Sequence, residues 1–214
     1  MPSARSTSWI LAAVAAICLA VAATLLLTPS GSPSPADFGS VPTAARPGTE
    51  VRDPPSQDAG RKVEPGEAAP SRVRIPRVGL EAEVVSVGLG ANGDVAVPGD
   101  PAQVGWYRRG PAPGDRTGSA VLAGHVDSET DRLGALAALY DVRAGDPVTV
   151  ERKRGKPLRY QVVARQLVPR DRLPEHLFRA DGPPVLTLIT CAPPYDREQG
   201  GYQNNLVVSA RPVR

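Results

Sequence analysis

The sequence predicts an all-β domain, a barrel or a sandwich, that follows an apolar N-terminal segment and a proline-rich linker. Short runs rich in Val, Ile, Leu and Thr recur between residues 71 and 214, and Gly, Pro or Asp ends each run. Residues 9–27 carry no charge, and the region that follows them is rich in Pro, Gly and Ser. These observations divide the chain into residues 1–28, 29–70 and 71–214.

The apolar segment Trp9–Leu27 predicts a transmembrane helix. At about 1.5 Å per residue, a helix of this length spans roughly the hydrocarbon core of a bilayer. Arg5 precedes the segment and the first acidic residue is Asp37, so the positive-inside rule places the short N-terminus in the cytoplasm. A secretory signal peptide usually has an apolar stretch of about 7–15 residues, so the length favours an uncleaved anchor. The expected location is therefore the cell membrane, with one span and an extracellular folded domain.

Residues 29–70 predict a linker. The segment combines many prolines with Gly, Ser and scattered charges, and its few large apolar residues show no period. Such a chain cannot bury a core, and we expect a semi-extended tether between the membrane and the folded domain.

The folded domain is expected to contain seven or eight strands and two short helices. The strand-like runs, punctuated by turn residues, cover residues 72–80, 81–89, 93–99, 118–126, 146–153, 158–168, 184–191 and 205–213. Helical character is confined to residues 131–142 and 173–178. The net charge is only +3 and aromatic residues make up 4% of the chain, without a basic cluster, so the sequence predicts no nucleic-acid partner.

The chemistry-bearing residues of the exported part are one cysteine and two histidines. Cys18 lies in the apolar segment as a small apolar residue, so Cys191 has no disulfide partner, which is unusual in an oxidising compartment. An adjacent imidazole commonly holds a cysteine as the thiolate nucleophile. His125 and Cys191 each follow a buried-type run, so neighbouring strands that end at one rim would bring them together.

Plainer interpretations of the same residues stay open. Cys191 could be a small core residue and His125 a satisfied histidine at a strand end. His176 lies among charged residues in a segment that we interpret as an exposed face. Two histidines and one cysteine without ligand spacing predict no metal site, and we see no acidic cluster that would bind calcium.

At these motifs the sequence resembles the sortases, the membrane-anchored cysteine transpeptidases of Gram-positive cell surfaces. The segments "LAGHVDS" and "LTLITC" carry the resemblance, while "RIPRVGLEAEVV", "VPGDPAQVGWY" and "GPAPGDRTGSAVLAGHVDS" are most similar to class F sortases. The similarity covers essentially residues 72–210. It implies an eight-stranded sortase-like β-barrel with short helices and no cofactor.

The resemblance also implies roles for individual residues. Cys191 would attack the Thr–Gly carbonyl of an LPXTG-like sorting signal in a secreted protein, and an amine of a peptidoglycan precursor would resolve the thioester. His125 would be the general acid and then the general base. Asp127 is expected to support His125 by proximity, and Thr190 to support the neighbouring cysteine.

The third sortase residue, an arginine, is not matched. The stretch that should hold it reads "GYQNNLVV", so Gln203 stands at the arginine position. Removal of a donor to an oxyanion typically costs about 10²–10³ in rate. Arg197 or, farther along the chain, Arg211 could compensate, and we favour Arg197.

The missing arginine leaves a second interpretation, an attenuated or inactive sortase-like module that binds sorting-signal peptides. A third class, the L,D-transpeptidases, places a Ser-His-Gly-Cys stretch at the nucleophile. Cys191 instead follows Ile189 and Thr190, so this class is set aside.

Overall fold

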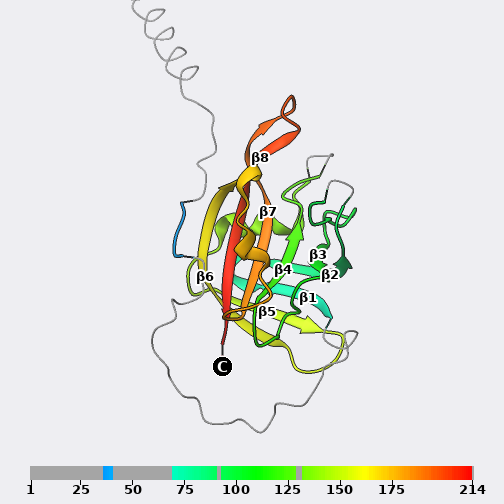
Figure 1. The fold of residues 1–214 in the computed structure, drawn as a ribbon, viewed down its shortest axis with the longest axis vertical. Helices are drawn as coiled ribbons and strands as arrows, with labels where there is room; N and C mark the ends of the chain where they lie inside the picture. The colour runs from blue at the N-terminus through cyan, green and yellow to red at the C-terminus, as the bar shows by residue number, and fades with distance from the viewer. Residues whose placement is uncertain (1–35, 41–68, 91–92, 129–131, 214) are drawn as a thin grey trace, which may run out of the picture. The chain divides into compact units, whose positions relative to one another are not determined.

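The computed structural model describes residues 36–40, 69–90, 93–128 and 132–213 (Figure 1). The expected transmembrane segment 9–27, with Cys18, and most of the linker lie outside the described residues. Among the residues that are described, no helix has the length and apolar character that a membrane crossing needs.

Eight strands within the described residues close into a barrel, which confirms the all-β prediction. The order of the strands around the barrel is β1-β2-β3-β4-β7-β8-β6-β5. Their bounds are β1 Pro70–Ile75, β2 Leu80–Val87, β3 Val104–Tyr107, β4 Ser119–Gly124, β5 Pro147–Arg152, β6 Leu158–Pro169, β7 Val185–Asp196 and β8 Gly201–Pro212.

The described connections contain four short 3-10 helices, η1 Pro76–Val78, η2 Ala135–Asp141, η3 Arg170–Arg172 and η4 Glu175–Phe178. η2 and η4 lie within the two segments for which helical character was predicted. η1 interrupts the first predicted strand because Pro76 fixes a turn and Gly79, with φ of 67°, adopts the left-handed conformation after it.

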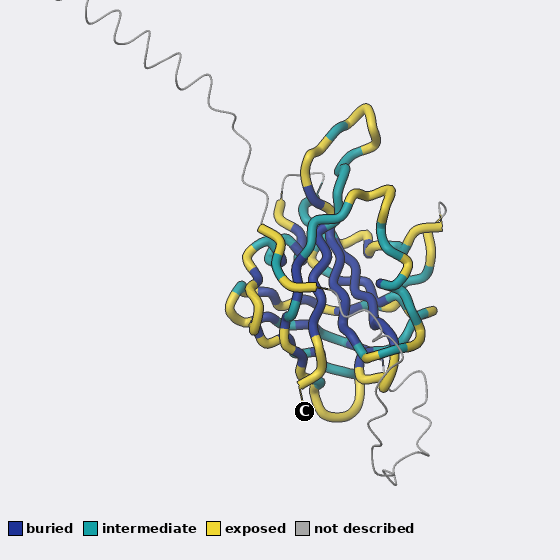
Figure 2. The backbone as a smooth tube through the Cα atoms, turned by 60° about the vertical axis from the view of Figure 1, so that its left-hand side comes forward, coloured by how far each residue is buried: buried dark blue, intermediate teal, exposed yellow. Residues whose placement is uncertain are grey.

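The barrel interior is one apolar core to which all eight strands contribute. β2 alternates between buried and exposed residues, as a strand with one covered face does. β4 and the first half of β7 are buried on both faces (Figure 2). Their outer faces join a second cluster formed by Val121, Leu177, Ile189 and Val207, in which Leu177 of η4 covers the strands.

The third strand differs from the prediction. Residues 93–99 form no strand beyond the isolated bridge of Leu89 with Val95, and the chain pairs instead through β3 at residues 104–107. A Cβ on Gly105 would lie 2.9 Å from the Val87 methyl groups, so the glycine allows β2 and β3 to approach closely. Long-range pairing, rather than the local pattern, therefore decides where this strand forms.

The end of β7 also differs from the prediction. A turn was expected directly after Cys191, but β7 continues to Asp196, and β8 begins at Gly201 rather than at Asn205. The two strands form a projecting hairpin, drawn in orange and red in Figure 1, in which Asp196 pairs with Gly201. Tyr195 and Tyr202 pack edge to face across it, with ring centroids 5.0 Å apart.

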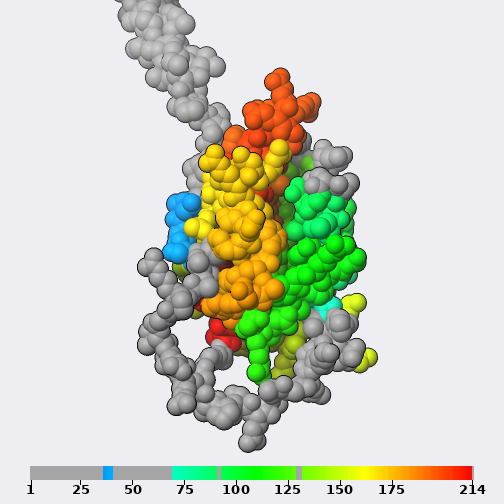
Figure 3. All heavy atoms as spheres, in the orientation of Figure 1, coloured from blue at the N-terminus to red at the C-terminus, as the bar shows by residue number. Residues whose placement is uncertain are grey.

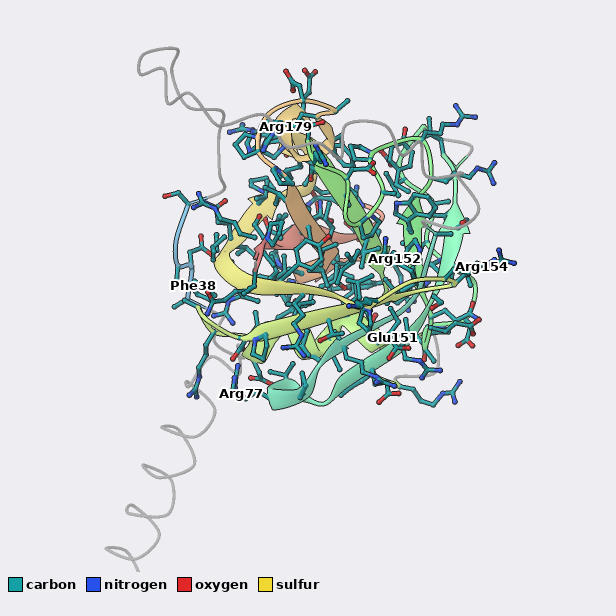
Figure 4. The ribbon with its side chains drawn as sticks, turned by 90° about the horizontal axis from the view of Figure 1, so that it is seen from below. Phe38, Arg77, Glu151, Arg152, Arg154 and Arg179 are labelled. Carbon is teal, nitrogen blue, oxygen red and sulfur yellow. The ribbon has the colours of Figure 1, made fainter. Side chains whose placement is uncertain are left out.

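Part of the predicted linker contacts the barrel. The backbone of Phe38 exchanges two hydrogen bonds of 2.9 Å with Arg165 of β6, and the Asp37 carboxylate accepts one from the Leu167 amide at 2.8 Å. The Arg165 guanidinium lies 5.2 Å from the centroid of the Phe38 ring. Figure 4 labels Phe38. Residues 36–40 are therefore an added strand-like segment along β6.

An ion pair between Arg77 and Asp146 stabilises the connection between β1 and β2. Arg77 of η1 donates to both carboxylate oxygens of Asp146, at 2.6 and 2.7 Å, and its position is labelled in Figure 4. The Asp146 side chain is only 8% exposed. The hydrogen bonds from Arg77 hold the pKa of Asp146 below its usual value, against the opposing effect of burial.

Candidate active site

Cys191 and His125 occupy matching positions on two paired strands. β4 and β7 are parallel neighbours, with Ala123 opposite Ile189, so two further residues along each strand lead to His125 and Cys191. Alternation places Cys191 on the same outer face of the barrel as Ile189. The structure therefore brings the two predicted residues to one rim.

Thr190 fixes the two chains directly before this pair. Its side chain is 2% exposed, and its hydroxyl donates a hydrogen bond of 2.9 Å to the carbonyl oxygen of Gly124. Gly124 precedes His125 and Thr190 precedes Cys191. The predicted supporting residue thus connects the strands that carry the imidazole and the thiol.

Two cavities meet at the cysteine. The first, which we call the apolar cavity, has a volume of about 660 Å³ and lies between residues 89–110 on one side and residues 170–180 on the other. Figure 3 shows this boundary between the green and the yellow to orange parts of the surface. Its apolar lining includes Leu89, Val97, Tyr107, Leu173, Phe178 and Ile189. This cavity can hold an extended peptide with apolar side chains next to the thiol.

The second, which we call the polar cavity, has a volume of about 1170 Å³ and contains His125 beside Cys191. Its other polar lining residues include Asp127, Ser128, Arg132, Arg170, Arg197 and Tyr202. The thiol therefore lies where the apolar cavity and the polar cavity meet. A peptide in the first cavity and an amine in the second would both reach the sulfur.

The environment of Cys191 favours the neutral thiol. The residue is exposed and forms no disulfide. Even so, burial of the sulfur raises the pKa of the Cys191 thiol, and the Asp127 carboxylate raises it further, whereas the Arg170 guanidinium lowers it. The thiolate at neutral pH is consequently a minor form that needs a base to generate it.

His125 is half-buried and its ring is oriented by the backbone. Its Nε2 lies 2.8 Å from the carbonyl oxygen of Pro98. A carbonyl oxygen can only accept, so Nε2 carries a proton, and in the neutral ring Nδ1 is the nitrogen that can take another. This arrangement suits a group that exchanges a proton with a neighbouring sulfur or amine.

Asp127 contacts a residue other than the one predicted. Its carboxylate accepts a short hydrogen bond from the Tyr202 hydroxyl, so the structure does not pair it with His125. Burial and this hydrogen bond raise the pKa of Tyr202, so the phenol stays protonated. The Tyr140 hydroxyl donates to the backbone oxygen of Cys191 at 3.2 Å, and burial raises the pKa of Tyr140 to about 12. Both phenols are therefore neutral donors beside the thiol.

The family model of the sortase domain matches residues 73–213. The chain belongs to the sortase family. Members of this family are cysteine transpeptidases that act on sorting-signal proteins and cell-wall amines. No curated protein matches the chain.

Solved sortases share the barrel. Sortase C1 from Streptococcus agalactiae is 23% identical, with 70% of this chain and 68% of that chain covered and a TM-score of 0.53. A lid mutant of sortase A from Corynebacterium diphtheriae is 22% identical over 67% of this chain and 69% of that chain, with a TM-score of 0.51. Sortase C-1 from Actinomyces oris is 23% identical over 67% of this chain and 73% of that chain, also with a TM-score of 0.51. These likenesses show the fold.

The three residues considered as substitutes for the sortase arginine have different surroundings. The Gln203 side-chain amide donates to the carbonyl oxygen of Gly201, at 2.6 Å, within its own hairpin. Arg197 is exposed and lines the polar cavity, but not the apolar one. Arg211 lines neither cavity, and β8 places it near the far end of the barrel, opposite Gln161.

Sequence reasoning missed three residues of the sortase site. Tyr140 and Tyr202 carry no motif that marks them, because only the barrel brings η2 and the hairpin to Cys191. Arg170 lines both cavities and is the first residue of η3, directly after β6. No strand pattern marks it, because only the pairing of β6 with β8 brings this turn close to the thiol.

His176 stands apart from this site. It is half-buried in η4, and its Nε2 is buried with no hydrogen-bond partner among the described residues, so the ring is less exposed than the solvated histidine that the sequence predicted. The helix packs against β4, which turns one edge of the imidazole inward. His176 lines neither cavity at Cys191.

Proposed function

We propose that this sortase is a class F cysteine transpeptidase that cleaves an LPXTG-type sorting signal and transfers the protein to a cell-wall amine. The observation that carries the proposal is the register of β4 and β7, which sets His125 beside Cys191 at the junction of two open cavities. The class F assignment is supported by the segments "VPGDPAQVGWY" and "LAGHVDS". The extracellular, membrane-anchored location is supported by the uncharged segment 9–27.

The first half-reaction uses the thiol and the imidazole together. The Cys191 thiol gives its proton to His125, and the sulfur attacks the carbonyl carbon of the Thr–Gly bond. The C–S bond forms first, to give a tetrahedral intermediate; the C–N bond then breaks, and the imidazolium donates its proton to the departing glycine amine. The products are a thioester on Cys191 and a neutral imidazole.

The second half-reaction reverses the proton movement. The acceptor amine enters through the polar cavity, and His125 removes its proton as the nitrogen attacks the thioester carbon. The C–N bond forms, the C–S bond breaks, and the proton returns to the sulfur. Pro98 keeps the ring oriented in both steps, because the bond to its carbonyl uses Nε2 and leaves Nδ1 for transfer.

The runner-up function is a peptide-binding module with little turnover, and the observation that favours it is Gln203 at the arginine position. Both functions use the apolar cavity, so peptide binding alone does not separate them. Formation of a hydroxylamine-dependent product does, because only an acyl-enzyme can deliver the carbonyl to an added amine.

The test uses the full-length chain in detergent with an LPXTG-type peptide and hydroxylamine. We expect hydroxamate from the parent and none from Cys191→Ala or His125→Asn. His176→Asn is the matched control, since it removes the other exported imidazole, and it should keep the parental rate. Peptide binding without hydroxamate would support the binding module, and a Cys191→Ala variant as active as the parent would refute the enzyme.

A further inference from the structure

We propose that Arg170, the first residue of η3 directly after β6, supplies the positive charge that stabilises the oxyanion during acyl transfer at Cys191. The inference rests on the proposed function and adds a catalytic residue to it. Arg170 was assigned no role from the sequence, and it lies outside the hairpin in which the arginine of this family was sought.

The strand pairing brings the end of β6, which Arg170 directly follows, to the face of the barrel that carries the thiol. Cys191 of β7 pairs with Asn205 of β8, and Asn205 pairs on its other side with Val168 of β6. Val168 packs against the second apolar cluster on the outer face, together with Ile189. Arg170 is the first residue of η3, two residues after Val168, and it lines both cavities that meet at Cys191.

Two backbone carbonyls hold the guanidinium in place. Nη1 of Arg170 donates to the oxygen of Gly200 at 3.0 Å, and Nη2 donates to the oxygen of Gln199 at 3.0 Å. These bonds use two of the five N–H donors of an arginine and leave the rest for another acceptor. The turn of the β7–β8 hairpin therefore fixes the direction of the cation without neutralising it.

Arg170 is the charged residue that the two cavities share. The lining residues common to both are Val97, Arg170 and Cys191. Three further arginines line one of the two cavities only: Arg109 lines the apolar cavity, and Arg132 and Arg197 line the polar cavity. An oxygen that develops negative charge on a carbon bonded to Cys191 forms at this junction, which Arg170 also lines.

The electrostatics at the sulfur agree with this geometry. The Asp127 carboxylate raises the pKa of the Cys191 thiol, and the Arg170 guanidinium acts in the opposite direction. Gln203 offers an uncharged amide that already donates to Gly201. Two charged residues among those described change the pKa of the thiol, Asp127 and Arg170, and Arg170 is the positively charged one.

The step that Arg170 assists is the formation of the tetrahedral intermediate. The sulfur lone pair forms the C–S bond, and the π electrons of the carbonyl move to its oxygen, which becomes negative. Arg170 stabilises this oxygen by charge and by N–H donation. When the C–N bond breaks, the electron pair on the oxygen restores the C=O bond, and His125 protonates the leaving nitrogen.

The test compares Arg170→Gln and Arg170→Lys with Arg172→Gln in the full-length chain. Arg172 lies in the same 3-10 helix, its side chain is 81% exposed, and it lines neither cavity, so it is a matched control. We expect Arg170→Gln to lower kcat/KM for the LPXTG-type peptide about 10²-fold. Arg170→Lys should recover part of that loss, and Arg172→Gln should match the parent.

Alkylation of Cys191 provides a readout that needs no peptide. The rate with iodoacetamide follows the thiolate fraction, and mass spectrometry of the Cys191 peptide separates it from Cys18. Loss of a cation disfavours the thiolate, so Arg170→Gln should shift the pH profile upward, and Arg170→Lys should shift it less. An unfolding temperature measured in parallel reports whether the hairpin is still held.

The outcomes separate the two proposals. If Arg170→Gln and Arg170→Lys lowered kcat/KM equally and the pH profile of alkylation did not change, the charge role would be overturned. Arg170 would then only hold the hairpin in place. Parental turnover in Arg170→Gln, or a loss confined to Arg197→Gln, would also overturn it while Cys191→Ala remains inactive. Turnover that survives in Cys191→Ala would instead refute the proposed function itself.

Discussion

The hydrogen bond from Thr190 to Gly124 predicts a linked loss of stability and activity. Thr190→Val replaces the hydroxyl by a methyl group of similar shape and removes a buried bond of 2.9 Å. A buried hydrogen bond contributes about 0.5–1.5 kcal/mol, and an acceptor left without its donor costs about 1–3 kcal/mol. We therefore expect the free energy of unfolding to fall by about 1–3 kcal/mol.

The same bond holds the residues that precede His125 and Cys191, so its loss should also affect turnover. A displacement of about 1 Å can cost about 10²-fold in rate, and we expect a decrease of about tenfold or more. The matched control is Thr187→Val on the same strand, because its buried hydroxyl lies 2.8 Å from that of Ser119, away from the site. It should lose stability without a comparable loss of turnover.

Two measurements decide this prediction. Circular dichroism should show the unfolding temperature of Thr190→Val lowered by about 2–4 °C for each kcal/mol lost. Hydroxamate formation should fall in Thr190→Val far more than in Thr187→Val. The reasoning is refuted if Thr190→Val has the parental unfolding temperature and turnover, or if both variants lose turnover equally.

Three further perturbations test the site and the barrel. Asp127→Asn removes a negative charge that raises the pKa of Cys191, so alkylation at pH 7.5 should become faster; an unchanged rate would contradict the assigned electrostatics. Gly134→Ala would put a Cβ 2.3 Å from the carbonyl oxygen of His125, so we expect destabilisation of about 1–3 kcal/mol and lower turnover, measured by urea unfolding and hydroxamate formation. Asp146 has a lowered pKa, so its stabilising effect is complete above the ordinary carboxyl pKa of about 4 and is lost as the pH falls further. Unfolding of Asp146→Asn against pH should show a smaller acid-induced loss than the parent, and equal slopes would contradict it.

The fold was predictable where the local pattern and the final environment agree. β4 and β7 are runs of apolar residues because both of their faces are covered, and such runs are visible in the sequence. β3 was not predictable, since its four residues include a glycine and gain their strand state from pairing with β2 and β4. The extended hairpin after Cys191 was hidden by its prolines and glycines, which are also the residues of turns.

The site divides in the same way. Cys191 and His125 could be identified because each follows a strong strand and because the chain offers few other nucleophiles or bases. Arg170 could not, since its position relative to the thiol depends on β6 lying two strands away from β7 in the closed barrel. Tyr202 and Asp127 are far apart in the chain, and only the projecting hairpin explains their hydrogen bond.

The attachment of Asp37 and Phe38 to β6 bears on how this molecule behaves among its own copies. Near Arg165 and Leu167, β6 has backbone groups that β5 does not reach, and residues 36–40 satisfy them. A protein trimmed to begin at residue 71 would present those groups to solvent as an open strand edge, the kind of surface through which β-proteins dimerise or aggregate. We therefore expect residues 36–40 to limit self-association by covering this strand edge. Samples that retain them should remain monodisperse at concentrations where trimmed samples do not.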